Sequence, residues 1–351
     1  MRVTVTGATG NVGTALLRLL SADRAVTDIV GVARRRPQLE LPKVRWVQAD
    51  VSRSDLAPVM QGTDAVIHLA WLIQPSRDES VTRATNIDGS RRVFEAAVRA
   101  AVPRIVYASS VGAYAAGPKD RAVDESWPVT GIPSSFYSRH KAAVEAILDG
   151  FESSHPEVRV IRLRPGLIFG RDAASGIRRM FTGPLLPSFL LRPRWIPVVP
   201  AHDRLVFQAV HRDDVAQAYR LALIDDDARG AFNIAAEPVL DPPTLGRILG
   251  ARPVPVPDVA LRRAAALSWR LRLQPTEPGW VDMGLGVPLM DITRARTELG
   301  WRPAHSAADA LLELIDGMRE RAGAPTPPLD PSTGGPSRVR EFLTGVGHSS
   351  G

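Results

Sequence analysis

The chain has 351 residues, of which 44% are hydrophobic and 23% charged; it carries a formal net charge of +7 and contains no cysteine. A chain of this length and composition suits a soluble protein of one large or two closely joined domains, and the lack of cysteine excludes disulfide bridges, thiolate nucleophiles and zinc–sulfur centres. The arginines are scattered and are not interleaved with aromatic residues, so the charge predicts a solvated surface and not a nucleic-acid-binding strip.

Short apolar segments alternate with amphipathic segments through the first half of the chain. We expect strands at 2–6, 28–33, 44–50, 64–70, 103–110 and 158–166, and helices at 12–20, 89–102 and 136–151. Pro165 should end the sixth strand because proline cannot extend the ladder of a central strand. Strands that alternate with helices predict an α/β fold, a doubly wound parallel (Rossmann) sheet that binds ligands at the carboxyl ends of its strands.

The second half of the chain predicts a different architecture. We expect residues 1–166 to form the dinucleotide-binding domain, with return segments near 204–235, and residues 167–321 to form a smaller, mostly α-helical substrate lobe. Residues 322–351 are dominated by Pro, Gly and Ser, which predicts a disordered tail. No apolar run has the length of a membrane span, and the first residues lack the pattern of a signal peptide, so we expect a cytoplasmic protein.

A glycine-rich turn, TGATGNVG, follows the first predicted strand and precedes the first predicted helix. Gly7, Gly10 and Gly13 would let the backbone turn tightly and approach a pyrophosphate, which the free N–H groups at the helix N-terminus would attract. The same turn could be a tight loop without a ligand. Its position between the first strand and the first helix favours a nucleotide site.

The segment after the second strand, GVARRRP, favours one form of the nucleotide. NAD-binding folds place an acidic residue here to hold the ribose hydroxyls, but this segment contains none. Arg34 and Arg35 can instead grip a 2′-phosphate, while Arg36 precedes a proline. We therefore favour NADP(H) over NAD(H), unless the arginines only decorate the strand end. At the end of the third strand, Asp50 and Val51 are placed to border the adenine, or Asp50 caps the next helix.

The stretch YSRHK places Tyr137 and Lys141 four residues apart on one face of a predicted helix. A tyrosine has an ordinary pKa near 10, so it needs an ammonium within about 4–6 Å to act as an acid/base group at neutral pH. The pair would then move a proton while hydride moves to or from a nicotinamide ring. Ser110, at the end of the fifth strand, could hydrogen-bond a substrate oxygen. The alternatives are an amphipathic helix face and ordinary turn chemistry at the serine.

Several motifs follow one another in a recognisable order: TGATGNVG, DAVIHLA, TNIDGSRRVFEAA, IVYASSVGAY, DESWP, YSRHK, LRPGLIFG, VHRDDVAQA, AFNIAAE and TRARTELGWRP. With them the chain resembles, over about residues 1–320, the extended short-chain dehydrogenase/reductase family, of the NAD-dependent epimerase/dehydratase type. The resemblance implies that Ser110, Tyr137 and Lys141 form the catalytic triad and that Asn86 is structural.

The same resemblance implies a set of cofactor contacts at the glycine-rich turn, at strand ends and at the triad: Gly7, Thr9, Gly10, Asn11, Val12, Gly13, Ala70, Pro165, Leu167, Tyr137 and Lys141. It makes His211, Asp213 and Asp214 part of a mainly structural motif that links the two lobes. It also implies a homodimer through residues 89–102 and 136–151.

One departure from the family pattern concerns the substrate. Nucleotide-sugar members usually carry an arginine and an acidic residue just before VHRDDV, where this chain has Phe207 and Gln208, although Arg204 could substitute. We therefore expect an NADP(H)-dependent oxidoreductase that transfers hydride to or from a small carbonyl or alcohol substrate. A nucleotide-sugar epimerase or dehydratase with tightly bound NAD(P) is the alternative, followed by a non-enzymatic dinucleotide sensor. The expectation includes no metal and no nucleic-acid or membrane partner.

Overall fold

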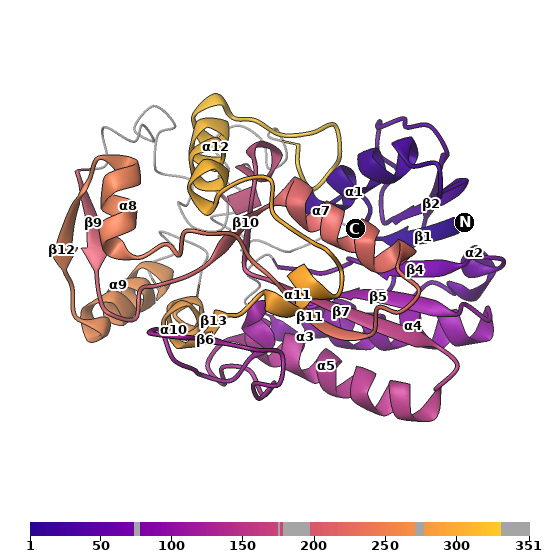
Figure 1. Cartoon of the computed structure of the whole chain (residues 1–351), viewed down its shortest axis with the longest axis horizontal. Helices are drawn as coiled ribbons and strands as arrows, with labels where there is room; N and C mark the ends of the chain where they lie inside the picture. Colours follow the sequence, from indigo (N-terminus) through magenta and orange to yellow (C-terminus); the bar gives the residue numbers. More distant parts are fainter. Residues whose placement is uncertain (74–77, 175, 178–196, 271–276, 331–351) are drawn as a thin grey trace.

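The computed structural model describes residues 1–73, 78–174, 176–177, 197–270 and 277–330 of the chain. Seven parallel strands form the central sheet in the order β11-β7-β5-β4-β1-β2-β3 (Figure 1). Their bounds are β1 Arg2–Thr6, β2 Asp28–Ala33, β3 Val44–Gln48, β4 Ala65–His68, β5 Arg104–Ala108, β7 Arg159–Pro165 and β11 Gly230–Ile234. The strand order reverses between β1 and β4, and this confirms the predicted doubly wound α/β fold.

Helices cover both faces of this sheet. Neighbouring residues of β5 show the division: Val106 belongs to one hydrophobic cluster, and Ile105 and Tyr107 belong to another, because successive side chains of a strand point to opposite faces. The first cluster includes buried residues of α1 and α7, and the second includes buried residues of α4 and α5. The bounds are α1 Asn11–Ala22, α4 Gly89–Arg99, α5 Phe136–Ser154 and α7 Arg212–Ile224.

A second lobe follows the sheet's sixth strand in the chain. It contains β9 Val198–Ala201, α8 Pro242–Leu249, β12 Arg252–Pro255, α9 Asp258–Arg270, α10 Gly279–Gly286 and α12 Ala307–Glu320. Shorter elements connect it to the sheet or lie along the sheet's margins: α2 Ala57–Met60, α3 Glu79–Arg83, β6 Ala122–Val123, β8 Leu167–Phe169, β10 Ala209–His211, β13 Leu289–Met290 and α11 Thr293–Thr297. Two of the pairings, β8 with β10 and β6 with β13, join segments that are far apart in the sequence.

The C-terminal end of α4 offers a test of backbone strain. Ala101 has a φ of 52°, while Ala101 N–H bonds Val98 O and Val102 N–H bonds Ala97 O, each at 2.9 Å. Glycine is the residue that suits this left-handed position. We expect Ala101→Gly to raise the free energy of unfolding by about 0.5–1 kcal/mol in urea denaturation. Ala100→Gly, at a negative φ, is the matched control and should lower it; equal losses in both variants would contradict the argument.

The start of the predicted disordered tail is corrected by the structure. Ala324, Thr326 and Leu329 are buried, and residues 324–330 are linked by backbone hydrogen bonds. Composition alone suggested disorder because Pro, Gly and Ser are frequent here, but these few residues pack against the body of the protein. The prediction is therefore wrong for residues 322–330, and residues 331–351 lie outside the described part of the chain.

Candidate active site

The glycine-rich turn has little room for side chains. A Cβ at Gly7, whose φ is 69°, would lie 2.5 Å from Ala70 N, and one at Gly13 would lie 2.5 Å from Gly7 O. Gly10 N–H closes the turn on Gly7 O at 3.0 Å, and α1 begins at the next residue. No side chain among the described residues caps this helix, so its first amides are available to an anion. The turn also places Ala70 directly beside it.

The candidate adenosine end of the site lies at the ends of β2 and β3. Arg34 and Arg35 directly follow β2 and are exposed, and Val51 is buried. Asp50 accepts hydrogen bonds from the Ser52 N–H and hydroxyl at 2.9 and 2.7 Å. Burial raises the pKa of Asp50, but these bonds and the nearby charge of Arg34 outweigh it and hold the pKa below its usual range. Asp50 therefore forms a local turn, and Leu56 takes the N-cap position of α2.

Ser110, Tyr137 and Lys141 meet at the carboxyl end of β5. Ser110 is the N-cap of a short 3₁₀ turn, and its hydroxyl oxygen accepts from Gly112 N–H at 3.0 Å. The same hydroxyl faces Tyr137 and acts to lower the pKa of its phenol. Tyr137 lies in the first turn of α5, and Lys141 lies one turn later with Nζ 5.9 Å from the Tyr137 ring centroid. A Cβ at Gly112 would lie 2.8 Å from Tyr137 Cε1, so only glycine fits under the ring.

The electrostatics of this group differ from the sequence argument, which expected Lys141 to lower the pKa of Tyr137. Burial raises the pKa of Tyr137 to about 12, and the Ser110 hydrogen bond offsets this only in part. Burial also lowers the pKa of Lys141 well below its usual range, against the opposing charge of Glu145. Lys141 Nζ donates to Ala108 O at 2.5 Å and lies 5.9 Å from the centroid of the Tyr137 ring.

Two tryptophans border Tyr137, and sequence reasoning missed both. Lys141 Nζ lies 3.5 Å from the ring centroid of Trp71, which meets Tyr137 edge to face at 6.0 Å. Trp280, on α10 of the second lobe, lies 5.1 Å from Tyr137, centroid to centroid. Trp71 directly follows Ala70, an expected cofactor contact, so its position in the sequence could have indicated that it borders the site. Trp280 reaches the site only through packing of the lobes, together with Met283.

Asn86 holds the backbone that carries Trp71. Its side-chain oxygen accepts from Leu72 N–H at 2.7 Å, and its side-chain nitrogen donates to Leu72 O at 3.0 Å. Asn86 lies in the π-helical turn Ala84–Asp88 that precedes α4. These bonds fix the segment after β4 beside the glycine-rich turn, in keeping with the structural role that the resemblance implied.

A buried ion group lies behind the triad. Glu145, one turn after Lys141 on α5, accepts from Arg164 Nε at 2.9 Å, from Arg162 Nη1 at 2.9 Å and from the Ser109 hydroxyl. Burial raises the pKa of Glu145, but the Arg164 and Arg162 contacts outweigh it and lower the pKa to about 2. The group thereby ties α5 to β7 and to the end of β5.

The loop after β7, which contains Pro165 and Leu167, is held from both sides. Gly166 N–H bonds Ile234 O at 3.0 Å, and Leu167 N–H bonds Gln208 O at 2.9 Å. The Gln208 side chain accepts from the Met290 N–H at 2.7 Å and donates to the Met290 carbonyl at 3.0 Å. A cavity of about 700 Å³ adjoins Gln208 and is lined by residues such as Glu237, Met290 and Arg296.

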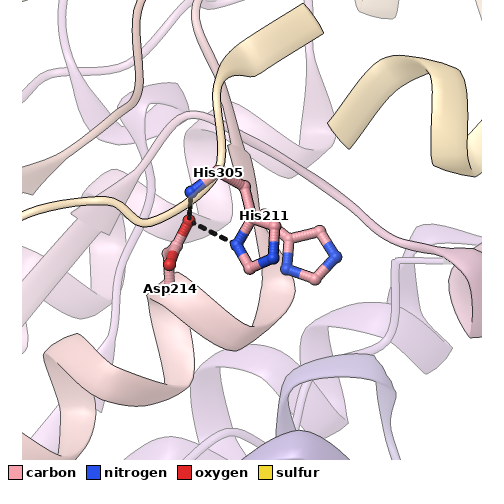
Figure 2. A group of neighbouring side chains, drawn as sticks. All are labelled: His211, Asp214 and His305. Carbon is pink, nitrogen blue, oxygen red and sulfur yellow. Dashed lines mark hydrogen bonds and ion pairs between the residues drawn. The ribbon is translucent and has the colours of Figure 1, made fainter. Parts of the chain in front are cut away.

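His211, Asp214 and His305 form a separate cluster that joins the lobes (Figure 2). Asp214 accepts from the His305 backbone N–H at 3.0 Å and from its Nδ1 at 3.1 Å, whereas His211 Nε2 faces Glu313 of α12 at 3.0 Å. The two imidazoles stack with centroids 4.0 Å apart. The two histidines bond different partners: His305 bonds Asp214 of α7, and His211 bonds Glu313 of α12. The cluster therefore connects α7 to α12 and to the segment that precedes it.

The sheet order, the turn before α1 and the covering helices define a protein of the Rossmann class. The chain belongs to the NAD dependent epimerase/dehydratase family, whose model matches residues 3–235. This confirms the resemblance drawn from the sequence. Within the described residues, each helix is too short or too polar to cross a membrane.

Individual relatives are distant. An uncharacterized protein of Mycobacterium tuberculosis is 28% identical over 326 residues, which are 92% of this chain but 31% of that protein, so the chain spans about a third of its length. The 2-alkyl-3-oxoalkanoate reductase of Shewanella oneidensis is 28% identical and is matched over 90% of this chain and 84% of its own. The structure of Thermus thermophilus UDP-glucose 4-epimerase complexed with NAD has a TM-score of 0.65 at 20% identity, covering 91% and 99% of the two chains; this likeness concerns the fold.

Proposed function

We propose that the protein is an NADP(H)-dependent oxidoreductase that transfers hydride to or from the carbonyl or alcohol carbon of a small, apolar substrate. The observation that carries this proposal is the placement of Ser110 and Tyr137 together at the carboxyl end of β5, with Lys141 one turn after Tyr137 on α5. In a doubly wound sheet this edge is where a nicotinamide ring would lie. The tryptophans and Met283 around Tyr137 favour an apolar substrate.

The residues present fit a dinucleotide. Gly7 and Gly13 keep side chains out of the turn, and the uncapped amides at the start of α1 suit a pyrophosphate. When bound, the reduced cofactor would supply the hydride. Ser110 would donate a hydrogen bond to the substrate carbonyl oxygen, and Tyr137 would give that oxygen its proton, so that a ketone plus hydride plus proton becomes an alcohol. Lys141 would hold the cofactor ribose and favour the phenolate that Tyr137 leaves behind.

A direct assay tests the function. Purified protein with NADPH is offered a panel of apolar ketones and aldehydes, and oxidation of NADPH is followed optically. The Shewanella relative, which is named as a reductase of 2-alkyl-3-oxoalkanoates, suggests these compounds as the first members of the panel. Turnover of at least one carbonyl supports the proposal, and dependence of that turnover on Tyr137 assigns it to this site.

The cofactor preference has its own test. Arg34 and Arg35 are exposed at the end of β2 and lie next to the position expected for a 2′-phosphate. We expect the double change Arg34→Ala, Arg35→Ala to weaken NADPH binding about tenfold and to leave NADH binding nearly unchanged, because only NADPH carries the phosphate that charge-assisted hydrogen bonds would hold. Calorimetric titration with both cofactors measures the ratio.

Arg36→Ala is the matched control, since Arg36 precedes Pro37 and is not expected to contact the phosphate. An unchanged NADPH-to-NADH affinity ratio in the double variant would show that these arginines do not select the cofactor, and NAD(H) would then be the better assignment.

A nucleotide-sugar epimerase or dehydratase is the second candidate. The family model and the fold of the Thermus UDP-glucose 4-epimerase favour it. The residues at the positions expected to hold a substrate diphosphate argue against an epimerase, because their side chains are already engaged. Gln208 is bonded to Met290, and Arg204 donates to Leu285 O and Gly117 O, both at 2.9 Å. A thermal-shift screen separates the two, because strong stabilisation by uridine or thymidine diphosphate would favour the epimerase.

The proposal extends to a homodimer packed through α4 and α5 and to a cytoplasmic location. Light scattering on the purified protein would measure the first, and fractionation of cells would measure the second.

A further inference from the structure

The segment that follows α12 returns to the glycine-rich turn at the other end of the chain. Thr326, which is 1% exposed, donates from its hydroxyl to Thr9 O at 2.9 Å. Figure 1 shows the yellow trace leaving α12 and reaching α1. The family model matches residues 3–235, so Thr9 lies within the matched part of the chain and Thr326 lies outside it.

The segment is a defined structure in which Thr326 is the central residue. Thr326 N–H donates to Ala324 O at 2.7 Å, and Thr326 O accepts from Leu329 N–H at 3.0 Å and Asp330 N–H at 2.9 Å. Ala324 and Leu329 are buried on either side of it. Because both backbone groups of Thr326 are engaged, the position of its hydroxyl is fixed relative to the turn.

The hydroxyl acts on one particular peptide plane. The Thr9 carbonyl and the Gly10 N–H belong to the same planar trans peptide and therefore point in opposite directions. Gly10 N–H bonds Gly7 O at 3.0 Å, and Thr9 O accepts from Thr326. The plane is thus held at both ends, and a rotation that broke one bond would break the other. The free amides of α1 begin at the next residue, Asn11.

We infer that Thr326 is a positioning residue for the cofactor site: by fixing the Thr9–Gly10 peptide, it holds the first amides of α1 in the orientation that receives the pyrophosphate. This inference rests on the proposed dinucleotide binding. A turn that is already ordered before the ligand arrives loses less conformational freedom on binding, and affinity rises accordingly. Thr326 needs no contact with the cofactor itself.

Valine and serine substitutions separate the hydroxyl from the shape of the side chain. We expect Thr326→Val to raise the NADPH dissociation constant about three- to tenfold, the value of one lost hydrogen bond, and Thr326→Ser to stay within about twofold of the wild type. In the protein without cofactor, amide hydrogen exchange at residues 9–13 should be faster in Thr326→Val and unchanged in Thr326→Ser, because the turn opens more often.

Thr297→Val is the matched control. Thr297 also donates its hydroxyl to a backbone carbonyl, that of Thr293 at 3.0 Å, but it lies on α11, which packs against β11 at the far edge of the sheet from β1 and β2. Its dissociation constant for NADPH should equal that of the wild type.

Three results would overturn the inference. Equal NADPH affinity in the wild type and Thr326→Val would do so while leaving the proposed function intact, and so would a Thr326→Ser variant as weak as Thr326→Val. If the wild type binds neither NADPH nor NADH, the proposed function fails, and this inference fails with it.

Discussion

Replacing Tyr137 with phenylalanine is expected to reduce turnover by about 10²–10⁴-fold while changing cofactor affinity far less. The ring would keep its contacts with Trp71 and Trp280, and Gly112 would still fit beneath it. What disappears is the hydroxyl that faces Ser110 and that would give the proton to the substrate oxygen. Measurement of kcat at saturating cofactor and substrate reports the loss directly.

Tyr219→Phe provides the control, because Tyr219 is a buried tyrosine on α7, on the opposite face of the sheet from α5. Its turnover should match that of the wild type. Loss of less than tenfold in Tyr137→Phe would assign the proton transfer to another group. The dependence of the rate on pH should differ between the two directions of the reaction. Oxidation of an alcohol needs the phenolate of Tyr137, and because the pKa of Tyr137 is raised to about 12, this rate should increase as pH rises. Reduction, which needs the protonated phenol, should not accelerate.

The largest effect on stability is expected from Glu145→Gln. Glu145 and Arg164 have side chains that are 2% and 5% exposed, and the carboxylate bonds two nitrogens of Arg164. Removing its charge leaves Arg164 as a buried cation whose other partners, Tyr114 OH and Glu125 O, are neutral. Breaking a buried pair in this way costs about 3–5 kcal/mol, so the midpoint of urea unfolding should fall sharply.

Glu152→Gln is the control for this effect. The Glu152 side chain is 36% exposed, and its buried partner Arg162 keeps the carboxylates of Glu145 and Asp149 when Glu152 is neutralised, so this change should cost about 1 kcal/mol or less. The pH dependence has a definite direction. Since the folded pKa of Glu145 is about 2 against an ordinary 4.5, its contribution is complete above about pH 4.5 and is lost as pH falls toward 2. The stability gap between wild type and Glu145→Gln should therefore narrow in that window; a constant gap would contradict it.

The sequence predicted those parts of the molecule that local pattern determines. Short apolar runs specify the strands, and the four-residue spacing of Tyr137 and Lys141 placed both on one helix face. The structure has Ser110 beside them at the end of β5, a grouping that the resemblance to the family implied. The raised pKa of Tyr137 in the protein without cofactor could not be predicted from the sequence, because burial depends on residues from the whole chain. Trp280 and Thr326 were missed for a related reason: each reaches its partner across more than 100 residues of chain, and no local pattern encodes such a contact.

The ion group behind the triad also constrains how the chain can change over time. A neutral residue at 145 strands a cation, and a neutral residue at 164 leaves the carboxylate with Arg162 as its remaining guanidinium partner. Each single step breaks the buried pair and lowers stability, most severely when position 145 changes first, whereas a joint exchange of both for apolar residues of similar volume removes the two charges together. Positions 145 and 164 are therefore expected to vary as a pair among descendants of this chain, and libraries for directed evolution should randomise them together.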